Sequence, residues 1–123
     1  MKDLVELTEQ VKDMIEELRI KYEKETEPVD KNDHDFFQKV KTETKSMFQL
    51  NDKWLAAAED FVKDKHVNVH PNQVKSTHEN VELLILHSYY IDVKKKRYKE
   101  LNRSVHYVMD MLLEDWNEGK GDQ

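Results

Sequence analysis

Six histidines are the side chains of this chain best suited to metal binding or acid–base chemistry. They are His34, His66, His70, His78, His87 and His106. Di-iron sites in four-helix bundles need Glu-x-x-His on two helices and inward-facing glutamates on the other two. The positions three residues before the histidines hold Lys31, Lys63, Val67, Lys75, Leu84 and Arg103. Because none of these is a carboxylate, we expect no metal site at the centre of a helical bundle.

Two residue pairs leave a metal- or ligand-binding site open as an alternative. His66 and His70 are four residues apart, but Pro71 follows them in a segment typical of a loop. His106 and Asp110 would share one helix face, where they could bind a metal or each other. Zinc needs a third and a fourth ligand, for which we identify no candidates. We therefore expect solvated surface histidines and no cofactor.

Covalent catalysis and phosphate binding lack their usual residues. The chain has no cysteine, and both of its glycines, Gly119 and Gly121, lie in the C-terminal tail. Glycine-rich phosphate loops, thiolate metal sites and cysteine nucleophiles are therefore excluded. His78, His87 and His106 could each accept a phosphoryl group, but no Lys-Gly pair follows any of them. We expect a protein that is not an enzyme.

A basic segment over residues 94–99, with the sequence KKKRYK, is the strongest local charge feature. It could bind an acidic partner, a phosphate group or RNA, with Tyr98 as a stacking platform. We favour a structural interpretation, in which the segment is a solvated turn that complements the carbonyl end of the preceding helix and Tyr98 enters the core. The possible partner-binding surface comprises Tyr89, Tyr90, Lys94, Lys95, Lys96 and Arg97.

The elements that position these residues are predicted to be helices. Prolines occur only at positions 28 and 71, so the strongest helix breakers are absent from 29–70 and 72–118. Apolar residues at spacings of three and four predict a first helix over 3–25. They are Leu4, Leu7, Val11, Met14, Leu18 and Tyr22.

A second helix is predicted over 35–64, after a polar linker. Asp33 or Asp35 could cap its N-terminus. Its apolar face comprises Phe37, Val40, Thr44, Met47, Trp54, Ala58 and Phe61. Asn51 takes a core position within this pattern, so we expect a bend or a short break near 50–52. A loop over 65–72 follows.

The stretch 72–117 contains no helix breaker and carries a heptad pattern. Its apolar face comprises Val74, Thr77, Val81, Leu84, Ile91, Tyr98, Leu101, Val105, Val108, Leu112 and Trp116. A single helix of this length could bury that face only by dimerising. We favour a turn within 92–97, because it produces helices over 72–90 and 96–117 whose lengths match the first helix.

Four such helices predict an all-α, four-helix up-and-down antiparallel bundle in one domain over 1–123, with a frayed tail over 118–123. The net charge of −6 argues against binding to nucleic acid or to an anionic membrane. No apolar run approaches the ~20 residues of a transmembrane helix, and no signal peptide is visible. We expect a cytoplasmic protein that is a monomer in preference to a dimer.

Three motifs resemble those of the YppE-like family of small bacterial proteins. They are Asp35-Phe36-Phe37, His87-Ser88-Tyr89-Tyr90 and Lys95-Lys96-Arg97-Tyr98-Lys99, within a similarity that spans about 33–116. The resemblance implies a four-helix bundle without an established biochemical function, and it supports a turn near 92–95. It carries over no catalytic or binding residue. Family members tend to have a histidine where this chain has Lys94, which weakens any expectation of a histidine cluster there.

These observations favour a non-enzymatic protein-interaction module with an unknown protein partner. Two alternatives remain open. One is a ligand- or metal-binding bundle that uses surface histidines, and the other is a dimeric coiled-coil adaptor built on a single long helix.

Overall fold

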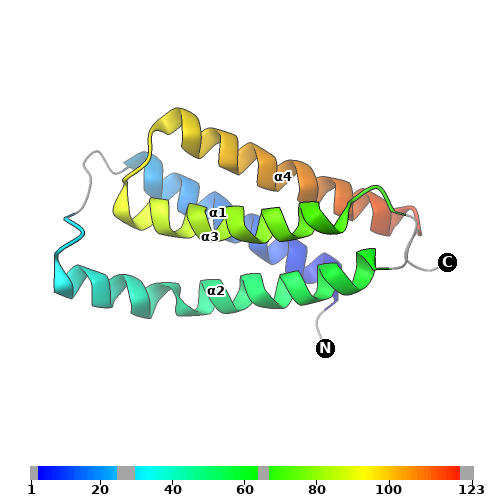
Figure 1. The fold of residues 1–123 in the computed structure, drawn as a ribbon, viewed down its shortest axis with the longest axis horizontal. Coiled ribbons are helices and arrows are strands. Elements are labelled where there is room, and N and C mark those ends of the chain that lie inside the picture. Colours follow the sequence, from blue (N-terminus) through cyan, green and yellow to red (C-terminus); the bar gives the residue numbers. More distant parts are fainter. Residues whose placement is uncertain (1–2, 25–29, 64–66, 120–123) are drawn as a thin grey trace.

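The computed structural model describes residues 3–24, 30–63 and 67–119, which form four α-helices. They are α1 (Leu4–Lys24), α2 (His34–Val62), α3 (Pro71–Tyr90) and α4 (Lys95–Asn117). Successive helices run in opposite directions along one long axis (Figure 1). The prediction of an all-α four-helix bundle is therefore confirmed. The predicted helix ends at 25 and 64, and residues 120–123 of the tail, lie outside the described residues.

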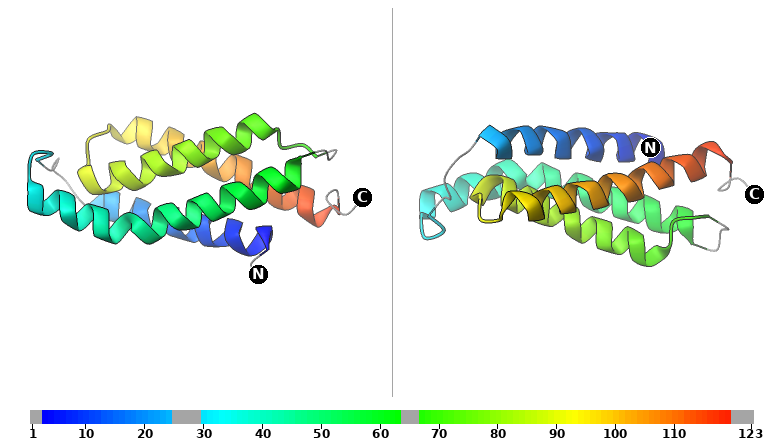
Figure 2. Two further views of the ribbon diagram at one scale, coloured as in Figure 1. Left: turned by 60° about the horizontal axis from the view of Figure 1, so that its bottom comes forward. Right: turned by 90° about the horizontal axis from the view of Figure 1, so that it is seen from above.

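Helices α1 and α3 form the centre of the bundle, since each of them packs against all the other helices. Helices α2 and α4 lie on opposite sides of this pair (Figures 1 and 2). Helix α2 therefore packs mainly against α1 and α3. One flank of α2 is left without a neighbouring helix, which matters for the site described below.

The predicted signals at the helix N-termini are confirmed. The Oδ1 atom of Asp33 accepts a hydrogen bond from the Phe36 backbone N–H at 3.0 Å, which caps α2. Pro71 occupies the first turn of α3, where its missing N–H costs nothing. The Nδ1 atom of His70 caps that helix by accepting from the Asn72 N–H at 3.1 Å.

Helix α3 ends at a left-handed residue, Ile91, whose φ is 51°. Its backbone N–H donates to the His87 carbonyl at 2.9 Å, which closes the last turn. Residues 91–94 then separate α3 from α4 (Figure 1). The predicted turn is confirmed. The alternative prediction of a single helix over 72–117, which the coiled-coil adaptor required, is wrong.

Helix α2 is continuous across 50–52, so the short break expected there is absent. Its axis changes direction along its course, as the left view in Figure 2 shows. Asn51 is fully buried, as its phase predicted, and its amide nitrogen donates to the His78 carbonyl at 3.0 Å. This hydrogen bond satisfies the amide nitrogen inside the interface between α2 and α3. The Oδ1 atom of the same side chain is buried without a hydrogen-bond partner among the described residues.

The apolar faces are largely as predicted, and the described residues that differ are the partly buried Met14, Met47 and Ile91 and the exposed Phe37 and Trp116. Ile15 is buried on α1, whereas Met14 is only partly buried. Phe37 is 48% exposed and Trp116 is 37% exposed, although both were predicted to lie in the core. Both residues lie near helix ends. Phe37 is exposed because α2 has 29 residues and α3 only 20, so the first turns of α2 extend past the end of α3 (Figure 1).

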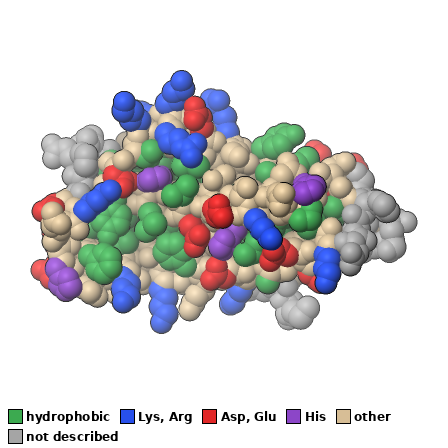
Figure 3. Space-filling view, viewed as in Figure 1, with side chains coloured by type: hydrophobic (Ala, Val, Ile, Leu, Met, Phe, Trp, Pro, Cys, Tyr) green, Lys and Arg blue, Asp and Glu red, His purple; other side chains and the backbone are tan. Residues whose placement is uncertain are grey.

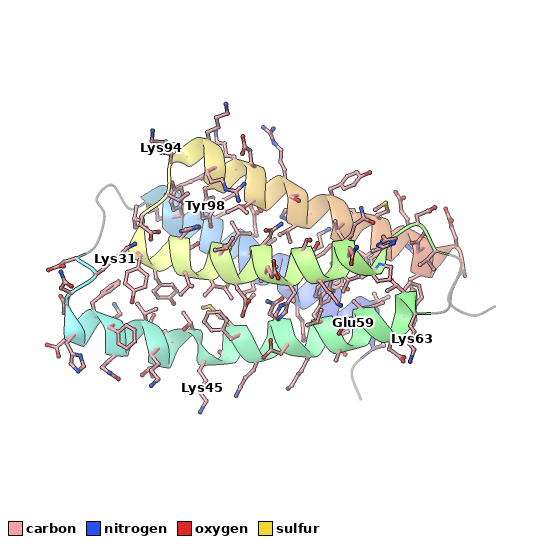
Figure 4. The ribbon with its side chains drawn as sticks, viewed as in Figure 1. Lys31, Lys45, Glu59, Lys63, Lys94 and Tyr98 are labelled. Carbon is pink, nitrogen blue, oxygen red and sulfur yellow. The ribbon has the colours of Figure 1, made fainter. Side chains whose placement is uncertain are left out.

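A buried group of hydroxyl-bearing side chains holds the α3–α4 end of the bundle together. Tyr98 is buried, as predicted, and its ring stacks on that of Tyr22 with 3.9 Å between centroids. The Tyr98 hydroxyl lies 2.6 Å from Ser88 Oγ (Figure 4), while the Tyr22 hydroxyl donates to the Val93 carbonyl at 2.7 Å. Burial raises the pKa of Tyr98 to about 12, so its hydroxyl stays protonated.

Candidate partner-binding groove

An apolar groove of about 600 Å³ lies between α2 and α3. Its wall on α2 runs from Phe37 to Asp52, and its wall on α3 comprises Leu86 and Tyr90. A second hollow of about 350 Å³ continues it toward the end of α3. The two hollows share Phe37, Leu86 and Tyr90, so they form one continuous surface feature. We call this feature the α2–α3 groove.

The packing of α2 explains why this groove exists. In its N-terminal half only Val40 and Thr44 are fully buried, and both are small side chains. The larger side chains of Phe36 and Phe37 lie on the same half of α2, and they fill the space between α2 and α3 only in part. Phe36 packs edge-to-face on Tyr90 with 5.6 Å between ring centroids, whereas Phe37 remains half exposed. The space-filling view shows the resulting hydrophobic surface over α2 and α3 (Figure 3).

Charged groups at the groove rim are partly neutralised within the chain. The two carboxylate oxygens of Asp92 bind Lys31 Nζ and His87 Nδ1, each at 2.7 Å. Burial raises the pKa of the Asp92 carboxyl, but Lys31 and His87 outweigh that effect and the net shift is downward. At the other end, Asp52 Oδ1 lies 2.8 Å from His78 Nε2.

The two tyrosines of the predicted partner surface lie in different environments. Tyr90 is partly exposed and lines the α2–α3 groove. Tyr89 is only 5% exposed, so the expectation that it is a surface contact requires correction. Its hydroxyl donates to Glu43 Oε1 at 3.1 Å, and Lys21 Nζ lies 4.6 Å from its ring centroid. Tyr89 therefore ties α3 to α2 and α1.

The basic residues Lys94, Lys95, Lys96 and Arg97 are all exposed. Lys94 is the N-cap of α4 without a side-chain cap hydrogen bond, and the other three form the first turn of that helix (Figure 4). In the described part of the chain, none of their side chains hydrogen-bonds to α3. The carbonyl end of α3 is closed by the Ile91 N–H instead. The structure thus places these cations where the dipole of α4 disfavours positive charge.

The histidines are dispersed over the bundle. His34 is exposed at the start of α2, and His66 lies outside the described residues. His106 is partly buried, and its predicted companion Asp110 pairs with Lys12 at 2.5 Å. Burial and the nearby Lys12 lower the pKa of His106. Within residues 3–24, 30–63 and 67–119, no group of three histidine or carboxylate side chains is arranged to hold a metal ion.

The sequence pattern did not reveal the groove. Leu83 and Leu86 lie off the predicted apolar face of α3, and each is more than a third exposed. The available signal was an excess of apolar residues in the segment VELLILHSYY, which is more than one helix face needs.

Among the described helices, none is long and apolar enough to cross a membrane.

Comparisons with known proteins confirm the resemblance that the motifs indicated. The uncharacterized protein YppE of Bacillus subtilis (strain 168) is 26% identical over 113 residues, which cover 91% of this chain and 90% of YppE. The crystal structure of YppE superposes with a TM-score of 0.74 at 24% identity, covering 94% of each chain. Its solution NMR structure gives 0.72 at 24% identity, covering 91% of this chain and 92% of the other.

The fold and the sequence also agree with one family model. The model for a bacterial domain of unknown function, DUF1798, matches residues 8–116, which include all of α2 and α3 and most of α1 and α4. The groove and the basic segment both fall inside the matched region. This chain therefore belongs to the bacterial DUF1798 family.

Proposed function

We propose that this protein is a non-enzymatic protein-interaction module and that the α2–α3 groove binds its partner. The observation that carries the proposal is the gathering of exposed apolar side chains. Six large hydrophobic residues are exposed among those described, and three of them line the groove: Phe37, Leu83 and Leu86. Contiguous apolar surface of this kind marks interaction sites in a protein whose exterior is otherwise charged.

The walls of the groove favour a helical segment of a partner protein as the occupant. Both walls are α-helices, whose backbone groups are already hydrogen-bonded within α2 and α3. A bound segment must therefore satisfy its own backbone donors and acceptors, as a helix does. From Phe37 to Asp52 the α2 wall is about 22 Å long, which accommodates a helix of four turns. Amphipathic helices bind such grooves through residues spaced three and four apart.

We propose a second contact surface at the start of the basic segment, formed by the exposed side chains of Lys94, Lys95, Lys96 and Arg97. Exposed cations in the first turn of a helix oppose the helix dipole, so they do not serve the stability of α4. Arg97 forms an ion pair with Glu100 at 4.0 Å. The charges of Lys94, Lys95 and Lys96 are available to a partner with acidic residues. We further propose that the protein acts in the cytoplasm as a monomer, without nucleic acid or membrane, in keeping with its net charge of −6.

The groove proposal is tested by capturing partners with purified protein from an extract of the bacterium that makes it. We expect the double variant F37S/L86S to recover at least about tenfold less of any specific partner, because central apolar contacts dominate interface affinity. The matched control is Ile20→Ser, which removes an equally exposed apolar side chain on α1. Equal recovery by the wild type and the double variant would contradict the proposal.

Native mass spectrometry of protein recovered gently from its own cells tests the competing occupant. A groove of about 600 Å³ is also within the range of small-molecule sites. A bound helix-bearing partner adds kilodaltons to the 14.8 kDa chain, whereas a small ligand adds hundreds of daltons. Added mass of hundreds of daltons that disappears in F37S/L86S would replace the partner-binding proposal with ligand binding.

A further inference from the structure

The carboxylates at the rim of the α2–α3 groove are paired with basic side chains of the same chain. Asp92 binds both Lys31 and His87, and Asp52 lies in hydrogen-bond contact with His78. These contacts span 2.7–2.8 Å, so the negative charge of each carboxylate is directed at a neighbour within the bundle. The acidic groups of the rim are therefore poorly placed to bind a basic partner.

The lysines of the α2 wall are in the opposite situation. Lys41 and Lys45 line the groove and are exposed. Within the described parts of the chain, neither has an ion-pair or hydrogen-bond partner. Figure 4 shows that the Lys45 side chain extends from α2 away from α3. The flank of α2 that has no neighbouring helix thus presents two free positive charges beside an apolar surface.

The spacing of these lysines limits what can pair with both. They are four residues apart on α2, which separates their positions by about 6 Å along the helix axis. A second helix laid along the groove presents carboxylates at the same separation when they are also four residues apart. An apolar stripe on that helix would meet Phe37, Leu86 and Tyr90 at the same time.

We propose that the occupant of the groove is an acidic amphipathic helix of a partner protein. It carries an apolar stripe flanked, on the side facing α2, by Asp or Glu residues one helical turn apart that pair with Lys41 and Lys45. This inference rests on the proposed function, and it adds the charge and the geometry of the partner segment. Complementary rim charges of this kind set partner choice and association rate more than affinity.

The test uses photo-crosslinking in bacterial cells that contain the full-length protein. The photoreactive amino acid p-benzoylphenylalanine replaces Phe37, whose half-exposed side chain tolerates the larger ring. Mass spectrometry then identifies the segment that is crosslinked. We expect an amphipathic helical segment with carboxylates four residues apart. The charge reversal K41E/K45E should lower the crosslinking yield about tenfold, and exchanging the partner's two carboxylates for lysine should restore it.

The matched control is K53E/K75E, which changes the net charge equally at two exposed positions of α2 and α3 outside the groove. We expect it to retain the wild-type yield. A crosslinked segment that is neutral or basic, a product of two copies of this chain, or a K41E/K45E yield equal to that of the control would overturn the inference. Absence of any protein crosslink at position 37 would instead refute the proposed function itself.

Discussion

Asp115 is a buried carboxylate that hydrogen-bonds to the segment preceding α3. It is fully buried on α4, and its carboxylate accepts hydrogen bonds from the Asn68 and Val69 backbone N–H groups and from the Asn68 side chain. Asp115→Ala leaves these donors unpaired, so we expect it to lower the free energy of unfolding by about 3 kcal/mol.

Urea denaturation of Asp115→Ala and of the control Asp110→Ala checks this expectation. Asp110 makes an ion pair with Lys12 near the surface, so its removal should cost less than about 1 kcal/mol. Equal effects of the two substitutions would show that the buried carboxylate does not anchor residues 68–69.

His106 should make stability depend on pH. Burial, followed by the charge of Lys12, lowers its pKa below the ordinary value of 6.5. The unfolded state therefore binds more protons than the folded state as the pH falls through 6.5 and on to the folded pKa, and the free energy of unfolding decreases over that range. The charged groups that act on His106 are Lys12, Asp110, Glu16 and Arg19.

We expect His106→Gln to flatten the stability curve between pH 7 and the folded pKa, when unfolding is measured at a series of pH values. The control His34→Gln removes an exposed histidine and should leave the wild-type slope. Parallel curves for the wild type and His106→Gln would contradict the assignment.

The positions of some single residues could be predicted from the sequence, and those of others could not. The position of Tyr98 in the core could be predicted from its heptad phase, and the capping role of Asp33 from its residue type. The burial of Tyr89 could not, because α3 lies at the centre of the bundle and packs against every other helix. A central helix buries more than one face, and its own sequence does not reveal its neighbours.

At the scale of the element, α4 has charges that oppose its dipole. Its first turn contains Lys95, Lys96 and Arg97 without any acidic residue. We therefore expect the double variant K95E/K96E to raise the free energy of unfolding by about 1 kcal/mol, and the melting temperature with it. Lys99→Glu, one turn further along, should have a smaller effect. A lower melting temperature for K95E/K96E would show that these lysines stabilise α4 through contacts that the dipole argument neglects.

Helix boundaries were the most predictable feature of the elements. Pro71 marked the start of α3, and the polar stretch after Ile91 marked its end. The continuity of α2 through 50–52 was less predictable. Asn51 and Asp52 suggested a new helix start. In the structure the Asn51 amide donates to the His78 carbonyl, and the Asp52 carboxylate is hydrogen-bonded to the His78 ring. These tertiary hydrogen bonds remove the reason for a break.

At the scale of the whole molecule, the groove follows from how unequal helices pack. Helix α2 is longer than α3 and lies at the side of the bundle, so its first turns extend past the end of α3. Periodicity assigned Phe37 to the core because a stripe shows which residues share a face, and it does not show where the partner helix ends. The apolar surface beside α2 is thus a property of the assembled bundle.

The central claim is that the α2–α3 groove binds a partner, and methyl NMR measures it most directly. Protein with isotopically labelled leucine and isoleucine methyl groups is added to an unlabelled extract of its own bacterium. We expect the signals of Leu83 and Leu86 to shift or broaden and those of Ile20 on α1 to remain unchanged. Unchanged Leu83 and Leu86 signals, or changes centred on Ile20, would contradict the account.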